Sequence, residues 1–171
     1  MIDVRPTIFD EAKVLIPDVF EDDRGFFKES FSHARYAEIG IDDEFVQDNV
    51  SYSIRNVVRG MHYDFRMAKL VQALRGRIYD VIVDMRPDSP TFRRWQGFYL
   101  SENNHKQLYV PRGFAHGFLV LSDDAIVMYK QTALYDPKHE CAISWRDESV
   151  GIAWPLVGTA RLSPKDAALP A

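Results

Sequence analysis

Short segments rich in β-branched residues, separated by glycine and proline turns, are the feature that most constrains how this chain folds. Residues 70–74 and 77–84 flank Arg75-Gly76, and this arrangement predicts a β-hairpin. Because side chains alternate along a strand, the second strand is expected to have two distinct faces. One face would carry Tyr79, Val81, Val83 and Met85, and the other would carry Asp80, Ile82 and Asp84.

Further strands are predicted along the rest of the chain, and helix is scarce. One short helix is expected over residues 32–39, because Ser32 is a favourable N-cap and Gly40 follows the helix end. Residues 162–166 are expected to form a loop or a short helical turn. The other strands are predicted over residues 57–63, 95–100, 107–110, 118–121, 125–131 and 141–145. Many short strands with a few short helices predict an all-β sandwich or barrel.

Length, charge and cysteine content narrow the class of protein. The chain has 171 residues, which suits one domain rather than two. A net charge of −4 disfavours nucleic acid or an acidic membrane as a partner. The single cysteine, Cys141, excludes an internal disulfide and a CxxC site. The N-terminus lacks the apolar core of a signal peptide, and no apolar run approaches the ~20 residues of a membrane span. We therefore expect one soluble, cytoplasmic domain over residues 1–171.

Two histidines lie in unusual settings, and the common catalytic motifs are missing. The sequence has no phosphate loop, no GxGxxG, no GxSxG and no HExxH. His62 follows Arg59-Gly60-Met61 in a predicted strand, and His116 lies among glycines and aromatic residues in the segment 111–118. Such surroundings shield an imidazole from water and let a ligand approach the backbone. The alternative is that both are core or turn histidines whose hydrogen bonds are satisfied internally.

The segment from Pro111 to His116 resembles half of the metal-binding signature of cupins, which are small jelly-roll barrels. The other half needs His-x-His followed by a glutamate, and here the chain reads His62-Tyr63-Asp64. Two imidazoles and one aspartate make a poor transition-metal site. We therefore expect the cupin-type barrel without a catalytic metal.

A pocket with histidine, lysine and tyrosine but no metal indicates proton chemistry. Histidine is the natural base near neutral pH, because its unperturbed pKa is ~6.5. Removal of a proton from carbon needs an adjacent carbonyl and a cation, such as Lys69, beside the enolate oxygen. A second group must return a proton to the other face of that carbon, and Tyr129 on a predicted strand is the candidate.

A series of short motifs, in order from Val19 to Asp166, resembles one family of nucleotide-sugar enzymes. The motifs are DRGFFKE at 23–29, FVQDN at 45–49, VRGMHY at 58–63, KLV at 69–71, SPTF at 89–92, PRGFAHGF at 111–118, GIAWP at 151–155 and LSPKD at 162–166. With them the chain resembles the dTDP-4-dehydrorhamnose 3,5-epimerases, which have a cupin fold. Each motif is modest alone, but all of them in order are highly specific.

The resemblance implies an isomerase that converts dTDP-4-dehydro-6-deoxy-D-glucose to dTDP-4-dehydro-L-rhamnose by epimerisation at C3 and C5, with no metal or organic cofactor. It implies that His62 is the base that removes both protons, and that Asp166 pairs with His62 and sets its tautomer. Tyr129 would be the acid on the opposite face. Lys69 and His116 would lie near the 4-keto oxygen and hold the enolate charge.

The resemblance also implies binding residues and a dimer. Tyr135 corresponds to an aromatic residue that stacks on thymine. The positions that would bind nucleotide or sugar are Arg24, Glu29, Gln47, Asn49, Arg59, Glu140 and Lys165, of which the three basic residues would supply positive charge for a diphosphate. The implied assembly is a homodimer in which residues 8–31 exchange between subunits and carry Arg24 and Glu29 to the neighbour's pocket.

Two local details bear on this expectation. Strict alternation would place Arg59 and His62 on opposite faces of a strand, whereas a bulge at Gly60 would bring both to the ligand. The loop over residues 64–68 is shorter than in typical members of the family, and we expect it to border the substrate.

Three alternative functions are weighed against the leading one. An epimerase that acts at one carbon only would differ in which enolate the pocket can reprotonate, and the placement of Tyr129 would decide this. A ketoisomerase that moves the carbonyl between C3 and C4 would work on one face of the sugar, so that Tyr129 would be dispensable. A sugar-binding cupin without catalysis would have no need for His62, Asp166, Tyr129 and Lys69 together.

Overall fold

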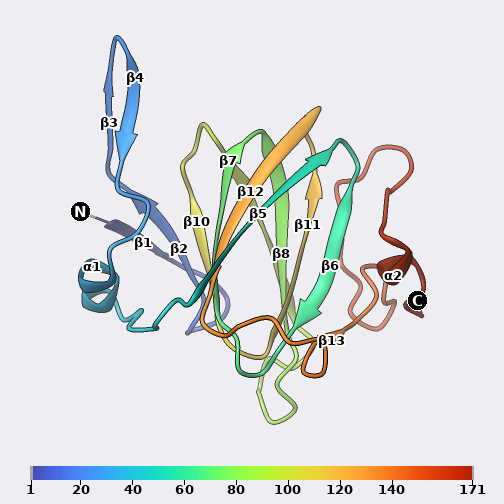
Figure 1. Cartoon of the computed structure of the whole chain (residues 1–171). Helices are drawn as coiled ribbons and strands as arrows, with labels where there is room; N and C mark the ends of the chain where they lie inside the picture. The colour runs from blue at the N-terminus through green and yellow to red at the C-terminus, as the bar shows by residue number, and fades with distance from the viewer. Residues whose placement is uncertain (1, 171) are drawn as a thin grey trace.

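The computed structural model describes residues 2–170 and consists mainly of two antiparallel β-sheets packed face to face (Figure 1). The six-stranded sheet has the order β1 (Ile2–Pro6), β2 (Lys13–Pro17), β10 (Gln107–Val110), β7 (Lys69–Arg75), β12 (Asp124–Gln131) and β5 (Gln47–Ile54). The five-stranded sheet has the order β13 (Cys141–Ala142), β6 (Val58–Tyr63), β11 (Phe114–Val120), β8 (Arg77–Asp84) and β9 (Trp95–Ser101). The two sheets stay separate, so the predicted all-β fold is a cupin-type sandwich rather than a closed barrel.

Alternation along β8 builds two distinct apolar layers. Ile78 and Ile82 lie in the main core between the two sheets, together with Val71, Val127 and Phe118. The other face of β8 packs outward against the C-terminal segment, through a cluster that contains Val81, Val83, Met85, Ile152 and Trp154. The two predicted faces of this strand are therefore confirmed.

A β-bulge interrupts the pairing of β6 with β11. The Cα of His62 is opposite His116, and the Cα of Arg59 is opposite Phe118, so two residues of β6 face the single residue Gly117. Gly60 has a φ of +124°, and a Cβ atom there would lie 2.6 Å from the Cα of Gly117. Only glycine fits such a close approach. Of the two arrangements that the sequence leaves open, the structure has the bulge, and Arg59 and His62 line the same cavity.

The structure corrects several predicted boundaries. The predicted strand 141–145 ends at Ala142, because its partner β6 bends into the bulge at that level. The predicted strand 118–121 begins earlier, at Phe114. Short helices form at α1 (His33–Glu38) and α2 (Pro164–Ala167), where a helix and a loop or helical turn were expected. β1, β2 and β5 were not predicted.

Two further strands, β3 (Val19–Asp22) and β4 (Gly25–Lys28), form a hairpin that projects from the sandwich, drawn in blue in Figure 1. Three phenylalanines on this hairpin are exposed: Phe20 at 64%, Phe26 at 55% and Phe27 at 72%. Across residues 2–170, none of the helices has the length and apolar character that a membrane crossing requires.

Candidate active site

A cavity of about 160 Å³ opens between the two sheets, beside the bulge in β6. β6 and β11 supply one wall, and β7 and β12 of the other sheet supply the opposite wall. Its lining residues are Arg59, Gly60, His62, Lys69, His116, Phe118, Tyr129, Gln131, Tyr135 and Glu140. A wider adjoining hollow of about 470 Å³ shares Arg59, His62, Tyr129 and Glu140 with it and adds Lys165 and Asp166. The structure thus brings most of the predicted site residues together.

His62 and Asp166 form a hydrogen-bonded pair at the rim of the cavity, which we call the rim pair. His62 Nε2 lies 2.8 Å from Asp166 Oδ1. The carboxylate comes from α2, where the Ser163 hydroxyl accepts a hydrogen bond from the Asp166 backbone N–H at 3.1 Å. The His62 side chain is 23% exposed, whereas that of Asp166 is 6% exposed. The ring is therefore fixed on one edge and open to the cavity.

Glu140 stands over the other nitrogen of His62. Its Oε1 lies 3.2 Å from His62 Nδ1, without the alignment of a hydrogen bond. Lys165 Nζ donates to Glu140, and the Tyr135 hydroxyl donates to the same carboxylate at 3.3 Å. Burial raises the pKa of Glu140, but the Lys165 contact and the charge of His62 outweigh it, so that the pKa is lowered overall. Glu140 is therefore an anion beside the ring.

Lys69 lies deeper, at the start of β7. Lys69 is 8% exposed, and its Nζ donates a hydrogen bond to the backbone carbonyl of His62 at 3.4 Å. Burial lowers the pKa of Lys69 to about 8, against the opposing charges of Asp80, Glu140 and Asp64. An ammonium group this poorly solvated is a strong partner for negative charge that develops on a ligand.

His116 and Asp80 form a second pair beneath the cavity, which we call the floor pair. His116 Nε2 lies 3.0 Å from Asp80 Oδ1 and 2.9 Å from Oδ2. Their side chains are 6% and 0% exposed. Asp80 was expected on one face of its strand with Ile82, but it was not among the predicted site residues. Gln131 and Phe118 were also missed as cavity residues.

Tyr129 faces the cavity from β12, in the sheet opposite His62. Burial raises the pKa of Tyr129, although the charge of Arg59 opposes this shift. The hydroxyl therefore keeps its proton near neutral pH and is suited to donate it. Arg59 is itself held by a hydrogen bond from Nε to the Ser53 hydroxyl, at 2.9 Å.

Gln47 and Asn49 lie on the inward face of β5 and reach the cavity through a chain of hydrogen bonds. Gln47 Nε2 donates to Asn49 Oδ1, and Asn49 Nδ2 donates to Gln131 Oε1, each at 2.9 Å. The backbone N–H of Tyr135 donates to Gln47 Oε1 at 3.1 Å. These amides fix two residues that line the cavity.

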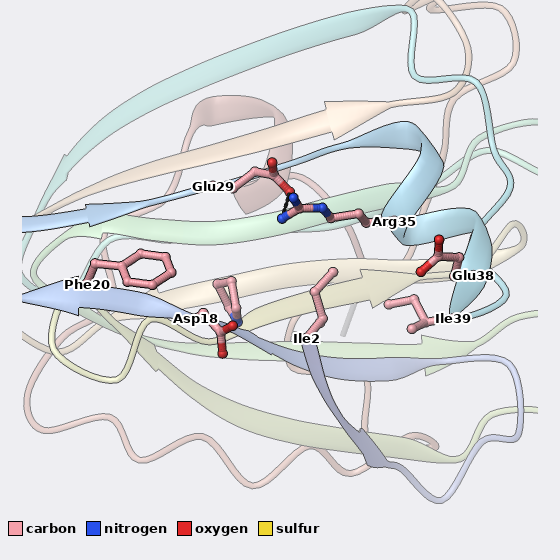
Figure 2. A pocket seen from close by; sticks show the side chains of 8 residues that line it. Ile2, Asp18, Phe20, Glu29, Arg35, Glu38 and Ile39 are labelled. Atoms are coloured by element: carbon pink, nitrogen blue, oxygen red, sulfur yellow. Dashed lines mark ion pairs between the residues drawn. The ribbon is translucent and has the colours of Figure 1, made fainter.

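Arg24 and Glu29 do not join the cavity within this chain. Arg24 lies on the projecting hairpin and pairs with Asp22 at 2.5 Å. Glu29 borders a separate hollow of about 150 Å³ next to α1. Figure 2 shows Glu29 turned toward Arg35, and the ion pair between them measures 3.2 Å.

The short loop over residues 64–68 borders a small recess of about 40 Å³ beside His62 and Lys69. The Asp64 carboxylate accepts hydrogen bonds from Arg66, and the Met67 backbone N–H donates to the Asp64 carbonyl at 3.0 Å. The Arg66 contact lowers the pKa of Asp64. The loop is thus a tight turn against the cavity, where it was expected.

Comparison with known proteins agrees with this geometry. The family model of dTDP-4-dehydrorhamnose 3,5-epimerase matches residues 6–171. The chain belongs to the dTDP-4-dehydrorhamnose 3,5-epimerase family. The enzyme of this name from Escherichia coli is 47% identical over 169 residues, which cover 96% of this chain and 91% of that protein.

Solved structures of this epimerase family share the fold. A structure described as dTDP-6-deoxy-D-glucose-3,5-epimerase from Legionella pneumophila, in complex with dTDP-4-keto-L-rhamnose, superposes with a TM-score of 0.96. It is 47% identical, and the match covers 99% of this chain and 92% of that chain. A more distant relative, the dTDP-4-dehydrorhamnose 3-epimerase of Streptomyces niveus, is 36% identical over 95% of this chain and 80% of that protein. The relatives therefore include an enzyme whose name specifies epimerisation at C3 alone.

The residue types that usually bind metal ions do not gather into a ligand set in the part of the chain that the structure describes. Among residues 2–170, no three His, Cys, Asp or Glu side chains are arranged to hold a metal ion. The aspartate at the position following His62-Tyr63 is engaged by Arg66 instead. The titratable groups around His62 are paired with one another, since its ring contacts Asp166 and Glu140, and Glu140 contacts Lys165.

Proposed function

We propose that this chain, acting as a single domain, epimerises C3 and C5 of dTDP-4-dehydro-6-deoxy-D-glucose and forms dTDP-4-dehydro-L-rhamnose. The observation that carries the proposal is the placement of His62 and Tyr129 on opposite sheets of one cavity. Inversion at carbon needs a base on one face and an acid on the other. A binding protein without catalysis has no use for this arrangement.

The proton steps follow from the contacts. Asp166 holds Nε2 of His62, so Nδ1 is the nitrogen left to accept a proton from C3 or C5. The electron pair of the broken C–H bond moves onto the 4-keto oxygen and forms an enolate. Tyr129 then returns a proton to the opposite face and regains one from solvent, and His62 releases to solvent the proton that it removed. Substrate takes the place of Glu140 beside Nδ1.

Lys69 and His116 are assigned to the enolate oxygen. They approach the cavity from opposite sheets, and both lie below the rim pair, where water is scarce. Donors fixed in a dry site stabilise developing charge more than they do in water. No metal or organic cofactor enters this scheme.

Nucleotide binding is assigned to the outer part of the site. Arg59 and Lys165 border the cavity and the wider hollow, and they provide positive charge for the diphosphate in a chain whose net charge is −4. Gln47, Asn49 and Glu140 are assigned to polar contacts with the nucleotide or sugar. Tyr135, which is 54% exposed, is assigned to stacking on thymine. A cytoplasmic location and the lack of nucleic-acid and membrane partners stay predictions from the sequence.

Incubation of the purified protein with the 4-keto nucleotide sugar in heavy water tests the reaction. Two deuterons in the recovered sugar support epimerisation at both carbons, because each carbon regains its hydrogen from solvent. One deuteron supports the alternative, an epimerase that acts at a single carbon. This second candidate is specific because one relative is named as a 3-epimerase. No uptake supports a binding protein.

We also propose that a second copy of this chain completes the site. The hairpin of β3 and β4 carries Arg24 and three exposed phenylalanines away from its own sandwich. β5 is an edge strand whose outer face exposes Val50, Tyr52 and Ile54, so it offers both apolar surface and unpaired backbone groups. A hairpin from a second copy that packs there would bring its Arg24 and Glu29 to this cavity.

Subunit complementation tests the exchange. His62→Ala inactivates the cavity of the subunit that carries it. Arg24→Ala removes only the arginine that this subunit contributes to the cavity of its neighbour. Random mixing of two inactive variants is expected to restore about one quarter of the wild-type sites if the hairpin is exchanged in a symmetric dimer. Mixtures that stay inactive, although light scattering shows dimers, contradict the exchange.

A further inference from the structure

The floor pair contains a carboxylate that the proton steps above do not use. Asp80 lies on β8 with its side chain fully buried between the two sheets, and both of its oxygens lie within 3.0 Å of His116 Nε2. A carboxylate in such a place is strongly disfavoured unless cations or hydrogen-bond donors surround it. The residues around Asp80 therefore indicate what its charge does.

Two potential cations share Asp80. One is the His116 ring in direct contact, on the neighbouring strand β11. The other is the Lys69 ammonium group, which reaches in from β7 of the opposite sheet. Among the charges that help Lys69 to keep its proton despite burial, that of Asp80 has the largest effect. One buried anion thus influences two groups that come from two different sheets.

We propose that Asp80 is a positioning residue for the enolate site, acting through His116 and Lys69. This inference rests on the proposed function. By occupying Nε2, Asp80 fixes the orientation of the His116 ring and leaves Nδ1 as the nitrogen available to a ligand. The same charge keeps Lys69 an ammonium group. The enolate oxygen then meets the Lys69 ammonium group and an imidazole of fixed orientation, both in place before substrate arrives.

The surroundings of Lys69 fix the direction of the expected pH effect. Charged and titratable groups face it from each packed element: His62 from β6, Asp80 from β8, His116 from β11, Tyr129 from β12, Asp64 from the loop before β7, and Glu140 from the segment before β13. Burial drives the ammonium group to lose its proton, and three carboxylates oppose that loss. Neutralising Asp80 removes the strongest opposition, so Lys69 releases its proton at a lower pH.

Asp80→Asn tests the proposal because the amide keeps the shape of the carboxylate and loses its charge. We expect kcat to fall on the order of 100-fold, with little change in KM. We also expect the alkaline limb of the pH profile of kcat to move to lower pH. The matched control is Asp84→Asn, which neutralises another fully buried aspartate on the same face of β8. Asp84 accepts hydrogen bonds from Arg86, Ser89 and Thr91. This control is expected to lower the melting temperature and leave the alkaline limb in place.

A loss of kcat that is the same at every pH, with the limb unmoved, would mean that Asp80 serves packing only and would overturn the proposal. A second measurement needs neither a variant nor activity. Nitrogen-15 NMR of the wild-type protein is expected to show a hydrogen on Nε2 of His116 at neutral pH, and a bare Nε2 would overturn the proposal. If wild-type protein exchanges no deuterium while the NMR result holds, the proposed function fails and the pairing of Asp80 stands.

Discussion

The rim pair and the floor pair are chemically alike, yet they are built into different parts of the molecule. Each joins histidine Nε2 to an aspartate, at 2.8 Å in one and 2.9 Å in the other. His62 is 23% exposed, whereas His116 is 6% exposed and its aspartate is fully buried. A ring that is open on one edge can exchange protons with substrate. A ring enclosed with its carboxylate is suited to keep one orientation.

The two pairs also differ in what holds the carboxylate. Asp80 sits in β8, which is hydrogen-bonded to β11 on one side and to β9 on the other. Asp166 sits in a helix of four residues near the end of the chain, fixed by the Ser163 cap. The comparison teaches that the proton-transfer pair depends on a short capped helix, whereas the buried pair is held between two paired strands.

Tyr129→Phe is expected to have the largest effect among the changes that leave both pairs intact. We expect inversion to slow by roughly 1000-fold, because the acid on the far face is lost while the base remains. Deuterium exchange without inversion is expected to persist, since His62 can still remove and return a proton on its own face. Mass spectrometry and NMR of the recovered sugar distinguish the two, and inversion at the wild-type rate would exclude Tyr129 as the acid.

Asp166→Asn breaks the rim pair while leaving the floor pair unchanged. We expect kcat to fall roughly 100-fold, because an amide can hold the ring in the wrong tautomer and does not stabilise a charged imidazole. Steady-state kinetics at several pH values measure the effect. The alkaline limb is expected to stay in place, in contrast to Asp80→Asn, and a moved limb would show that the two pairs are not independent.

The pH dependence of the wild-type enzyme reports on Lys69 above the floor pair. Its lowered pKa of about 8 means that the ammonium group is present below that pH and is lost above it. We therefore expect kcat to fall about tenfold for each pH unit above pH 8. In the unfolded chain, the lysine keeps its proton up to a higher pH. Between the two pKa values the unfolded state therefore binds more protons, and the free energy of unfolding rises with pH. A loss of activity that follows unfolding, seen by circular dichroism, would contradict this origin.

Ser163→Ala is expected to have the smallest effect and tests the adjustability of the rim pair. Removal of the N-cap hydroxyl costs ~1 kcal/mol of helix stability, which corresponds to a loss of activity of about fivefold or less. Hydrogen exchange over α2 should accelerate while exchange over β8 stays unchanged. Equal acceleration in both elements would mean that the rim is not the more mobile region.

The sequence predicted the parts of this fold whose inward faces are apolar. The hairpin of β7 and β8 was recognised because Val71, Ala73, Ile78 and Ile82 alternate into the core. β5 was missed because its alternation is inverted: Gln47 and Asn49 point inward to the cavity, and its exposed face carries Val50 and Tyr52. β1 and β2 were missed as well, and each ends in a proline, which weakens a strand signal.

The candidate site was predictable to the extent that its residues stand in local motifs. The sequence left open whether Arg59 and His62 lie on opposite faces or are brought together by a bulge at Gly60, and the structure has the bulge. Asp80 was missed because its partner lies 36 residues away, and strand register cannot be read from alternation alone. The roles assigned to individual side chains stay predictions until the variants are measured.

Deuterium uptake by His62→Gln and His116→Gln, measured side by side with the 4-keto nucleotide sugar, tests most directly whether the two pairs have different roles. Since the rim pair removes the protons, His62→Gln is expected to show no uptake above the uncatalysed rate. His116→Gln, which weakens only the support of the enolate, is expected to take up both deuterons more slowly. Full uptake in His62→Gln would contradict the account, whatever the behaviour of the second variant.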